Sequence, residues 1–140
     1  MNKKSLTTGN KEQVVKRLSE LLEDRNDVLF AYIFGSFASR DSFGDIDIGI
    51  FVNEGRVPSF LKLELEFEEE LGTAVHIPID VRVVNSAPLS FVYNVLKNGF
   101  TIVDKDKTLR ADFEGLIYKK YFDFSYLRRE YLREIIHAPV

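Results

Sequence analysis

The sequence predicts an α/β (α+β) domain, with helices packed on a small, mainly parallel or mixed β-sheet and a helical C-terminus. Two observations favour this class. Short apolar runs of strand length alternate along the chain with longer segments in which apolar residues recur at helical spacing. The 140 residues, 45% of them hydrophobic, are enough for a core, and no repeat or low-complexity segment divides them. Residues 1–140 are therefore expected to form a single domain.

The first half of the chain contains two predicted helices and two predicted strands. Residues 1–9 are polar and are expected to be flexible, as chain termini often are. Helical spacing of apolar residues predicts helices over residues 10–26 and 58–72, the second ending at a glycine. Val28–Phe34 and Ile46–Val52 are rich in strand-forming residues and too short for typical helices. Both are predicted to be strands, the first of them buried on both faces.

The second half begins with a third apolar run over residues 77–84, which predicts another strand. A helix is expected to begin at Pro88 and to end at Gly99, before a short edge strand over residues 100–103. Apolar residues recur at helical spacing over residues 107–137, with a break expected at residues 123–125. Such alternation of helices and strands is typical of the predicted fold class.

The composition limits the classes of function. The net charge of −3 argues against broad contact with nucleic acid, because phosphate neutralisation needs a basic face. The chain has no cysteine, which excludes disulfides and thiolate metal sites. No stretch approaches the ~20 apolar residues of a membrane span, so a cytoplasmic protein without membrane contact is expected. The acidic residues Glu64, Glu68 and Glu70 are expected to form a solvated helix face.

Two aspartates stand two residues apart at the start of the second predicted strand. Side chains alternate along a strand, so Asp45 and Asp47 should point to the same side of the sheet. Two carboxylates this close repel each other unless a cation lies between them. Magnesium is the expected cation, because it takes hard oxygen ligands and often bridges carboxylates to the phosphates of a substrate.

A third aspartate, Asp80, interrupts the apolar run of residues 77–84. A lone aspartate buried in such a strand is costly unless it is paired or bound to a metal. If its strand lies beside that of Asp47, Asp80 joins Asp45 and Asp47 in one acidic cluster.

Gly35 and Ser36 follow the first predicted strand and are expected to bind phosphates. Glycine lets the backbone approach a phosphate closely, while the next amides and the serine hydroxyl can donate hydrogen bonds to it. Arg40, in the same loop, is the best candidate for a side chain that contacts a triphosphate. With two magnesium ions at the aspartates, this arrangement suits nucleotidyl transfer by in-line displacement.

Each of these patterns has a simpler explanation when it stands alone. A Gly-Ser pair is usually only a turn, and two aspartates at this spacing often lie on a surface. The order is more restrictive: a strand, Gly-Ser, a short loop, a strand with two aspartates, and a later strand with a third. We therefore favour the catalytic interpretation of the whole set.

The stretch GSFASRDSFGDIDIGI, residues 35–50, resembles the signature of the nucleotidyltransferases related to DNA polymerase beta. Asp80 falls where the third aspartate of these enzymes is found, and the resemblance covers residues 28–125. The small size, without an added substrate domain, is similar to that of the minimal nucleotidyltransferases (MNT). Residues 79–124 further resemble the antitoxins of HEPN/MNT toxin–antitoxin pairs.

The resemblance implies a role for each residue of the motif. Gly35 and Ser36 would hold the nucleotide phosphates, and Asp45 and Asp47 would bind two magnesium ions. Asp80 would complete the shell of one ion and help to deprotonate the acceptor. Active antitoxins of this group transfer AMP from ATP to a tyrosine of a HEPN ribonuclease toxin. The resemblance therefore implies ATP as the substrate and a HEPN-domain toxin as the partner.

The loop departs from the usual motif. Ala38-Ser39-Arg40 stands where Ala-Arg-Gly is common, and Gly44 replaces the usual serine before the first aspartate. Every carboxylate is retained, so these departures bear on nucleotide affinity and loop geometry more than on the chemistry.

Two other functions remain open. A non-catalytic antitoxin that occludes its partner would fit the small size and the aromatic helical C-terminus, which contains Tyr118, Tyr121, Tyr126 and Tyr131. Transfer to a small molecule such as an antibiotic is less favoured, because no second domain is left to build its pocket. A homodimer is also left open, since minimal domains leave apolar helix faces uncovered.

Overall fold

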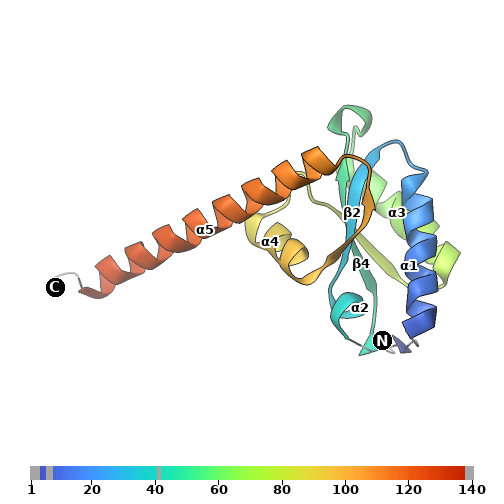
Figure 1. Ribbon diagram of the computed structural model, residues 1–140, viewed down its shortest axis with the longest axis horizontal. Coiled ribbons are helices and arrows are strands. Elements are labelled where there is room, and N and C mark those ends of the chain that lie inside the picture. Colours follow the sequence, from blue (N-terminus) through green and yellow to red (C-terminus); the bar gives the residue numbers. More distant parts are fainter. Residues whose placement is uncertain (1–3, 6–7, 41, 138–140) are drawn as a thin grey trace.

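The computed structural model describes residues 4–5, 8–40 and 42–137 of the chain. These residues form a central four-stranded mixed sheet with strand order β5-β4-β2-β6, and helices cover both of its faces (Figure 1). This architecture confirms the predicted fold class. In chain order the elements are β1 (Lys4–Ser5), α1 (Thr8–Glu23), β2 (Val28–Phe34), α2 (Ser36–Ser39), β3 (Ser42–Phe43), β4 (Ile46–Val52), the 3-10 helix η1 (Glu54–Arg56), α3 (Phe60–Val75), β5 (Ile79–Val83), α4 (Leu89–Asn98), β6 (Phe100–Asp104) and α5 (Lys107–His137).

The central strands are β2 and β4, which run antiparallel to each other with Phe34 beside Asp47. Both are buried along most of their length, as expected for apolar strands with helices on both faces. β6 lies antiparallel to β2 at one edge, as the sequence predicts, and β5 lies parallel to β4 at the other. The parallel pair brings the starts of β4 and β5 to the same end of the sheet.

The helices form two layers. α1 and α3 cover one face of the sheet, where they bury side chains such as Ile46, Ile48 and Ile50 (Figure 1). α4 and the first half of α5 cover the other face, where Phe30 and Tyr32 of β2 are buried. The second layer leaves the β5 side of its face uncovered, since its smaller core is built on β2.

The N-terminal elements begin earlier than expected. α1 starts at Thr8 rather than at Asn10, and Lys4–Ser5 pairs with β3 in a two-stranded antiparallel ladder. Residues 1–3 and 6–7, part of the segment expected to be flexible, lie outside the described residues.

Helix α3 continues past Gly72, the residue expected to end it. Ser59 caps its start by accepting a hydrogen bond from the amide of Lys62 (3.2 Å). At the other end His76 adopts a left-handed conformation, with a φ of 58°, and its amide donates to the carbonyl of Gly72. A left-handed residue can end a helix as a glycine does, and here that residue is His76. The helix therefore ends at Val75, and the predicted end at Gly72 is wrong.

The C-terminal region is helical as expected, but it is one helix rather than two. α5 runs unbroken from Lys107 to His137, so the break expected at residues 123–125 is wrong. Residues 116–137 contain neither glycine nor proline, the residues that most strongly interrupt helices. The first half of α5 packs on the body as far as Phe122, whose ring contacts Tyr93 of α4. The second half, residues 123–137, which we call the projecting half, extends away from the body (Figure 1). No helix in the described part of the chain is apolar enough over a sufficient length to cross a membrane.

Candidate active site

Three aspartates gather at one end of the sheet, on the face that α4 partly covers. Asp47 of β4 and Asp80 of β5 are direct partners in the parallel ladder, so their side chains project on the same side. Asp45 immediately precedes β4 and, two residues before Asp47, lies on that side too. The condition under which Asp80 joins the other two aspartates, that its strand lies beside that of Asp47, is therefore met.

Asp80 is exposed, although the sequence predicts a buried aspartate in an apolar strand. β5 is an edge strand whose side chains alternate between buried and exposed positions. Val81 and Val83 point into the core, whereas Asp80 points to the open face. The cost of burying a lone aspartate therefore does not apply, and the strand register alone places this carboxylate beside Asp47.

The carboxylates perturb one another. Burial, followed by the negative charges of Asp80 and Asp45, raises the pKa of Asp47 from 3.8 to about 6. Oδ1 of Asp45 is buried and accepts no hydrogen bond from the described residues. A buried acceptor without a donor is costly, and so is repulsion between carboxylates. A cation at this point would relieve both.

The backbone after β2 closes over Asp47. Gly35 has a φ of 77°, in the left-handed region that favours glycine. A Cβ at this position would lie 3.1 Å from Cγ of Asp47 and would overlap its Oδ2. Glycine is therefore required here for its backbone conformation and because Asp47 occupies the space of a side chain.

The short loop after Gly35 contains one helical turn, α2, in which the amide of Arg40 donates to the carbonyl of Ser36 (2.8 Å). A cavity of about 360 Å³ opens between this turn and α4. We call it the loop-side cavity. Its lining residues are Phe34, Gly35, Ser36, Ser39, Arg40, Asn94 and Asn98.

The loop-side cavity brings together Gly35, Ser36 and Arg40, the three residues that the sequence associates with a nucleotide. It also contains Asn94 and Asn98, which the sequence analysis does not identify. These two amide side chains are four residues apart on α4 and therefore share a helix face. The spacing of Asn94 and Asn98 could have predicted from the sequence that they share a helix face. Only the tertiary structure shows that this face borders the loop-side cavity.

Two glutamates expected on a solvated face of α3 instead bind the edge of the sheet. Oε2 of Glu68 accepts a hydrogen bond from the amide of Val81 (2.9 Å), and Oε2 of Glu64 accepts one from Val83 (2.8 Å). These amides would otherwise be unpaired, because β5 is an edge strand. Burial, and then the hydrogen bond and charge of Asp80, raise the pKa of Glu68 against the lowering effect of the Val81 amide. Glu68 thus belongs to the surroundings of the aspartates.

The donor set suits a hard divalent cation. Asp45, Asp47 and Asp80 offer carboxylate oxygens, the ligands that magnesium prefers, and the orphaned Oδ1 of Asp45 is available to one. Within the described residues, no three His, Asp or Glu side chains are already arranged as a metal site. The aspartates therefore fit magnesium in chemical type, and binding it requires their side chains to turn toward a common point.

Comparisons with known proteins identify the family and support the fold. The family model described as Polymerase beta, Nucleotidyltransferase matches residues 16–108. A search of curated proteins gives no match. A chain from the complex of a tri-AMPylated HEPN toxin with an MNT antitoxin, from Shewanella oneidensis, superposes with a TM-score of 0.69 and 17% identity. The match covers 90% of this chain and 98% of that chain.

Two further solved structures have the same fold. A toxin–antitoxin structure with AMP-PNP superposes with a TM-score of 0.63 and 18% identity, over 91% of this chain and 98% of that chain. The toxin–antitoxin MntA–HepT gives a TM-score of 0.63 and 16% identity, over 93% of this chain and 99% of that one. At these identities the likeness shows the fold, whereas the family model covers most of the chain, including Gly35, Ser36 and the three aspartates. The chain therefore belongs to the polymerase beta nucleotidyltransferase family.

Proposed function

We propose that this protein is a magnesium-dependent nucleotidyltransferase that transfers AMP from ATP to a tyrosine hydroxyl of a HEPN-domain ribonuclease toxin. It would act in the cytoplasm as the antitoxin of that toxin. The observation that carries the proposal is the register pairing of Asp47 with Asp80, with Gly35 packed on Asp47 and the loop-side cavity beside them.

The loop-side cavity is where the triphosphate of ATP would bind. Ser36 supplies a hydroxyl, Arg40 a guanidinium, and Asn94 and Asn98 amide donors, all of which suit phosphate oxygens. Gly35 leaves no side chain between this cavity and Asp47. Phosphates held by the loop would therefore reach the aspartates directly.

In this proposal Asp45 and Asp47 would hold two magnesium ions, and Asp80 would help to hold one of them. When bound, the ions would neutralise the phosphates and lower the pKa of the attacking hydroxyl. Asp80 helps to remove the proton of that hydroxyl. The hydroxyl oxygen then bonds to the α-phosphorus. The bond from this phosphorus to the pyrophosphate oxygen breaks, and pyrophosphate leaves with the electron pair.

The neighbours in fold support the choice of partner and of transferred group. One of them is an MNT antitoxin in complex with a tri-AMPylated HEPN toxin, and another was solved with AMP-PNP. We extend both features to this chain, which has the same fold over nine tenths of its length.

The position of a label in ATP distinguishes transfer of AMP from phosphorylation. The protein is incubated with magnesium, the product of the neighbouring gene, and ATP labelled at either the α- or the γ-phosphorus. We expect the α-label in the partner and no γ-label, with mass spectrometry locating the AMP on a tyrosine. Absence of the α-label in the partner, with protein that is folded and binds AMP-PNP, would contradict the proposal.

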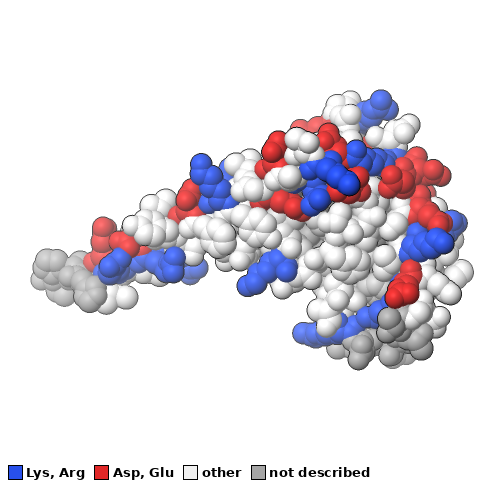
Figure 2. All heavy atoms as spheres, viewed as in Figure 1, with Lys and Arg blue, Asp and Glu red and all other residues white. Residues whose placement is uncertain are grey.

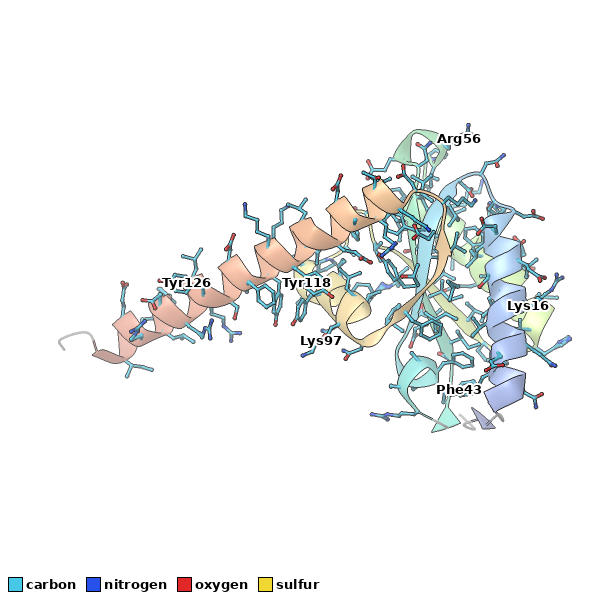
Figure 3. All side chains as sticks on the ribbon, viewed as in Figure 1. Lys16, Phe43, Arg56, Lys97, Tyr118 and Tyr126 are labelled. Carbon is cyan, nitrogen blue, oxygen red and sulfur yellow. The ribbon has the colours of Figure 1, made fainter. Side chains whose placement is uncertain are left out.

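The projecting half of α5 favours a second candidate, a non-catalytic antitoxin that covers its partner. Tyr118 and Tyr121 pack on Tyr93 of α4, but Tyr126 lies farther along the helix, away from the body (Figure 3). The exposed apolar side chains of this half are Phe124, Tyr126, Leu127, Tyr131, Leu132, Ile135 and Ile136.

Protection of cells against the toxin separates the two candidates. If the protein acts by AMP transfer, the double variant Asp45→Asn with Asp47→Asn should no longer protect cells. If it acts by covering its partner, this variant should protect fully, and a chain ending at residue 122 should not protect.

A further inference from the structure

A second cavity opens on the β5 side of the aspartates. It has a volume of about 470 Å³ and is enclosed by the start of α3, by β5 and by the segment that leads into α4. We call it the β5-side cavity. Its lining combines two aromatic rings, a cation, a carboxylate and two hydroxyls, from Phe60, Phe91, Arg82, Glu64, Ser86 and Ser90.

An aromatic pair separates the two cavities. Phe34 lines the loop-side cavity and Phe91 lines the β5-side cavity, and their rings meet edge to face with centroids 5.5 Å apart. Across the sheet, Gly35 of the loop-side cavity follows β2, Asp47 lies on the next strand, β4, and Asp80 lies on β5, the strand that carries Arg82. Neither lining includes an aspartate, but in this strand order the aspartates lie between Gly35 and Arg82.

Arg82 connects the β5-side cavity with the aspartates. It follows Asp80 by two residues on β5, so it projects on the same face, about 7 Å farther along the strand. Its guanidinium lies 5.4 Å from the centroid of the Phe91 ring. Among the described residues it forms no ion pair, although Glu64 lines the same cavity. An exposed cation in this position is available to a ligand.

We infer that the β5-side cavity is the acceptor site, and that Arg82 and Phe91 bind the partner segment that carries the acceptor hydroxyl. The inference rests on the proposed function and adds the place where the acceptor binds. In an in-line displacement, the attacking oxygen and the leaving pyrophosphate lie on opposite sides of the α-phosphorus. With the triphosphate in the loop-side cavity, the hydroxyl must approach from the β5 side, where Asp80 can take its proton.

The lining of the cavity indicates the chemistry of the segment. Phe60 and Phe91 offer ring surfaces to an aromatic side chain, and the Arg82 guanidinium can stack on such a ring or pair with a carboxylate beside it. A tyrosine can span the roughly 7 Å from Asp80 to Arg82, while a serine or threonine is too short to do so. The segment that fits is therefore an acidic one with an aromatic acceptor.

Replacement of Arg82 by alanine tests the inference. Transfer of labelled AMP is measured at saturating ATP over a range of concentrations of the partner protein, the product of the neighbouring gene. We expect Arg82→Ala to raise the half-saturating partner concentration about 10-fold or more and to change kcat by less than about threefold. The affinity for AMP-PNP, measured by calorimetry, should stay the same. Phe91→Leu keeps an apolar side chain but removes the ring, and should also raise the half-saturating partner concentration.

Salt dependence gives a readout that a merely structural role would not change. Added sodium chloride should weaken acceptor binding in the wild-type protein and much less so in Arg82→Ala, because the screened cation is gone. Arg17→Ala is the matched control, since Arg17 is exposed on α1, on the opposite face of the sheet. It should leave all of these quantities unchanged, and thermal unfolding checks that every variant is folded.

Two results would overturn the inference. One is an unchanged half-saturating partner concentration in Arg82→Ala, and the other is a loss of AMP-PNP affinity in that variant. If the wild-type protein transfers no AMP at all, the proposed function fails, and partner binding in the presence of AMP-PNP decides the inference separately. In that case we expect Arg82→Ala to bind the partner more weakly than the wild type does. Equal partner affinities of the two proteins would overturn the inference.

Discussion

The aspartate end of the sheet and the projecting half of α5 are held in place by different means. Asp47 and Asp80 are positioned by the register of two paired strands, whose opposite face is buried against α1 and α3. The projecting half carries exposed apolar side chains and extends away from the other described elements (Figure 1). The first region is fixed by contacts within this chain, whereas the second leaves its apolar surface exposed.

The first half of α5 shows what anchoring requires. The hydroxyl of Tyr32 donates a hydrogen bond to Oε2 of Glu114 (2.7 Å), and Arg110 forms ion pairs with Asp104 and Glu114 (2.9 Å each). Phe113 packs against two aromatic rings of the sheet. Helices shorter than roughly 12–15 residues are marginal on their own in water, so the projecting half depends on its continuity with this anchored half.

Charge adds a second difference between the two regions. The aspartate end brings together carboxylates of one sign, whereas basic and acidic side chains are interspersed along the projecting half (Figure 2). The basic ones include Arg128, Arg129 and Arg133, and the acidic ones include Glu130 and Glu134. A partner that meets this half would therefore present apolar side chains together with charges of both signs.

Gly35→Ala should disturb the aspartate end most among single substitutions. The new Cβ would overlap the Asp47 carboxylate and force a left-handed alanine, which costs about 1–3 kcal/mol of stability. Misplacing Asp47 should lower AMP transfer by roughly 10²-fold or more. Gly115→Ala is the matched control, because nothing lies within 4 Å of its Cβ, and it should stabilise the helix by about 0.5–1 kcal/mol. Full activity in Gly35→Ala would refute the arrangement of the site.

Polar substitutions in the projecting half should affect the partner and spare the fold. Phe124→Ser, Leu127→Ser and Tyr131→Ser together should weaken partner binding by about 100-fold, with little change in the free energy of unfolding. Leu61→Ser with Leu65→Ser, which removes equally exposed apolar side chains from α3, is the control. The same loss of affinity in both variants would mean that α5 is not a distinct partner surface.

Tyr32→Phe tests the anchoring of the first half. It removes the hydrogen bond to Glu114 from a side chain that is 2% exposed, and should cost about 1 kcal/mol in urea unfolding. Amide hydrogens near Glu114 should exchange faster, while AMP transfer stays unchanged. A stability equal to that of the wild type would show that this hydrogen bond does not help to hold α5.

The raised pKa of Asp47 gives the aspartate end a pH signature in the absence of metal. A carboxyl group whose pKa is raised to about 6 binds more protons in the folded than in the unfolded state between pH values of about 4 and 6. The free energy of unfolding should therefore fall as the pH rises through this window, by roughly 1 kcal/mol once solvent screening is allowed for. In EDTA, Asp47→Asn should lack this part of the dependence. Identical pH profiles for the two proteins would contradict the repulsion described above.

The sequence predicts the elements and the aspartates better than it predicts the surroundings of the site. Alternation along a strand is a local pattern, so Asp45 and Asp47 could be assigned to one face, and the apolar run around Asp80 predicts its strand. The exposure of Asp80 depends on β5 being an edge strand, which its own sequence does not specify. Glu68 turns toward the sheet for the same reason, since it pairs with amides that only an edge strand leaves free.

The two cavities were not predictable, because each is built by elements far apart in the chain. Asn94 reaches the loop after β2, and Arg82 meets Phe91, only through the packing of α4 beside the sheet. The uninterrupted α5, in contrast, follows from a local feature, the absence of glycine and proline from residues 116–137.

The central claim is that the aspartate end carries out the chemistry and is not needed for the fold or for partner binding. The most direct test is Asp45→Asn together with Asp47→Asn, compared with the exposed pair Asp24→Asn and Asp112→Asn as control. We predict that the first variant loses AMP transfer by roughly 10³-fold or more. Its partner affinity should be unchanged and its melting temperature equal or higher, because carboxylate repulsion is relieved. Transfer within about threefold of the wild type, or a loss of activity that accompanies unfolding, would contradict the claim.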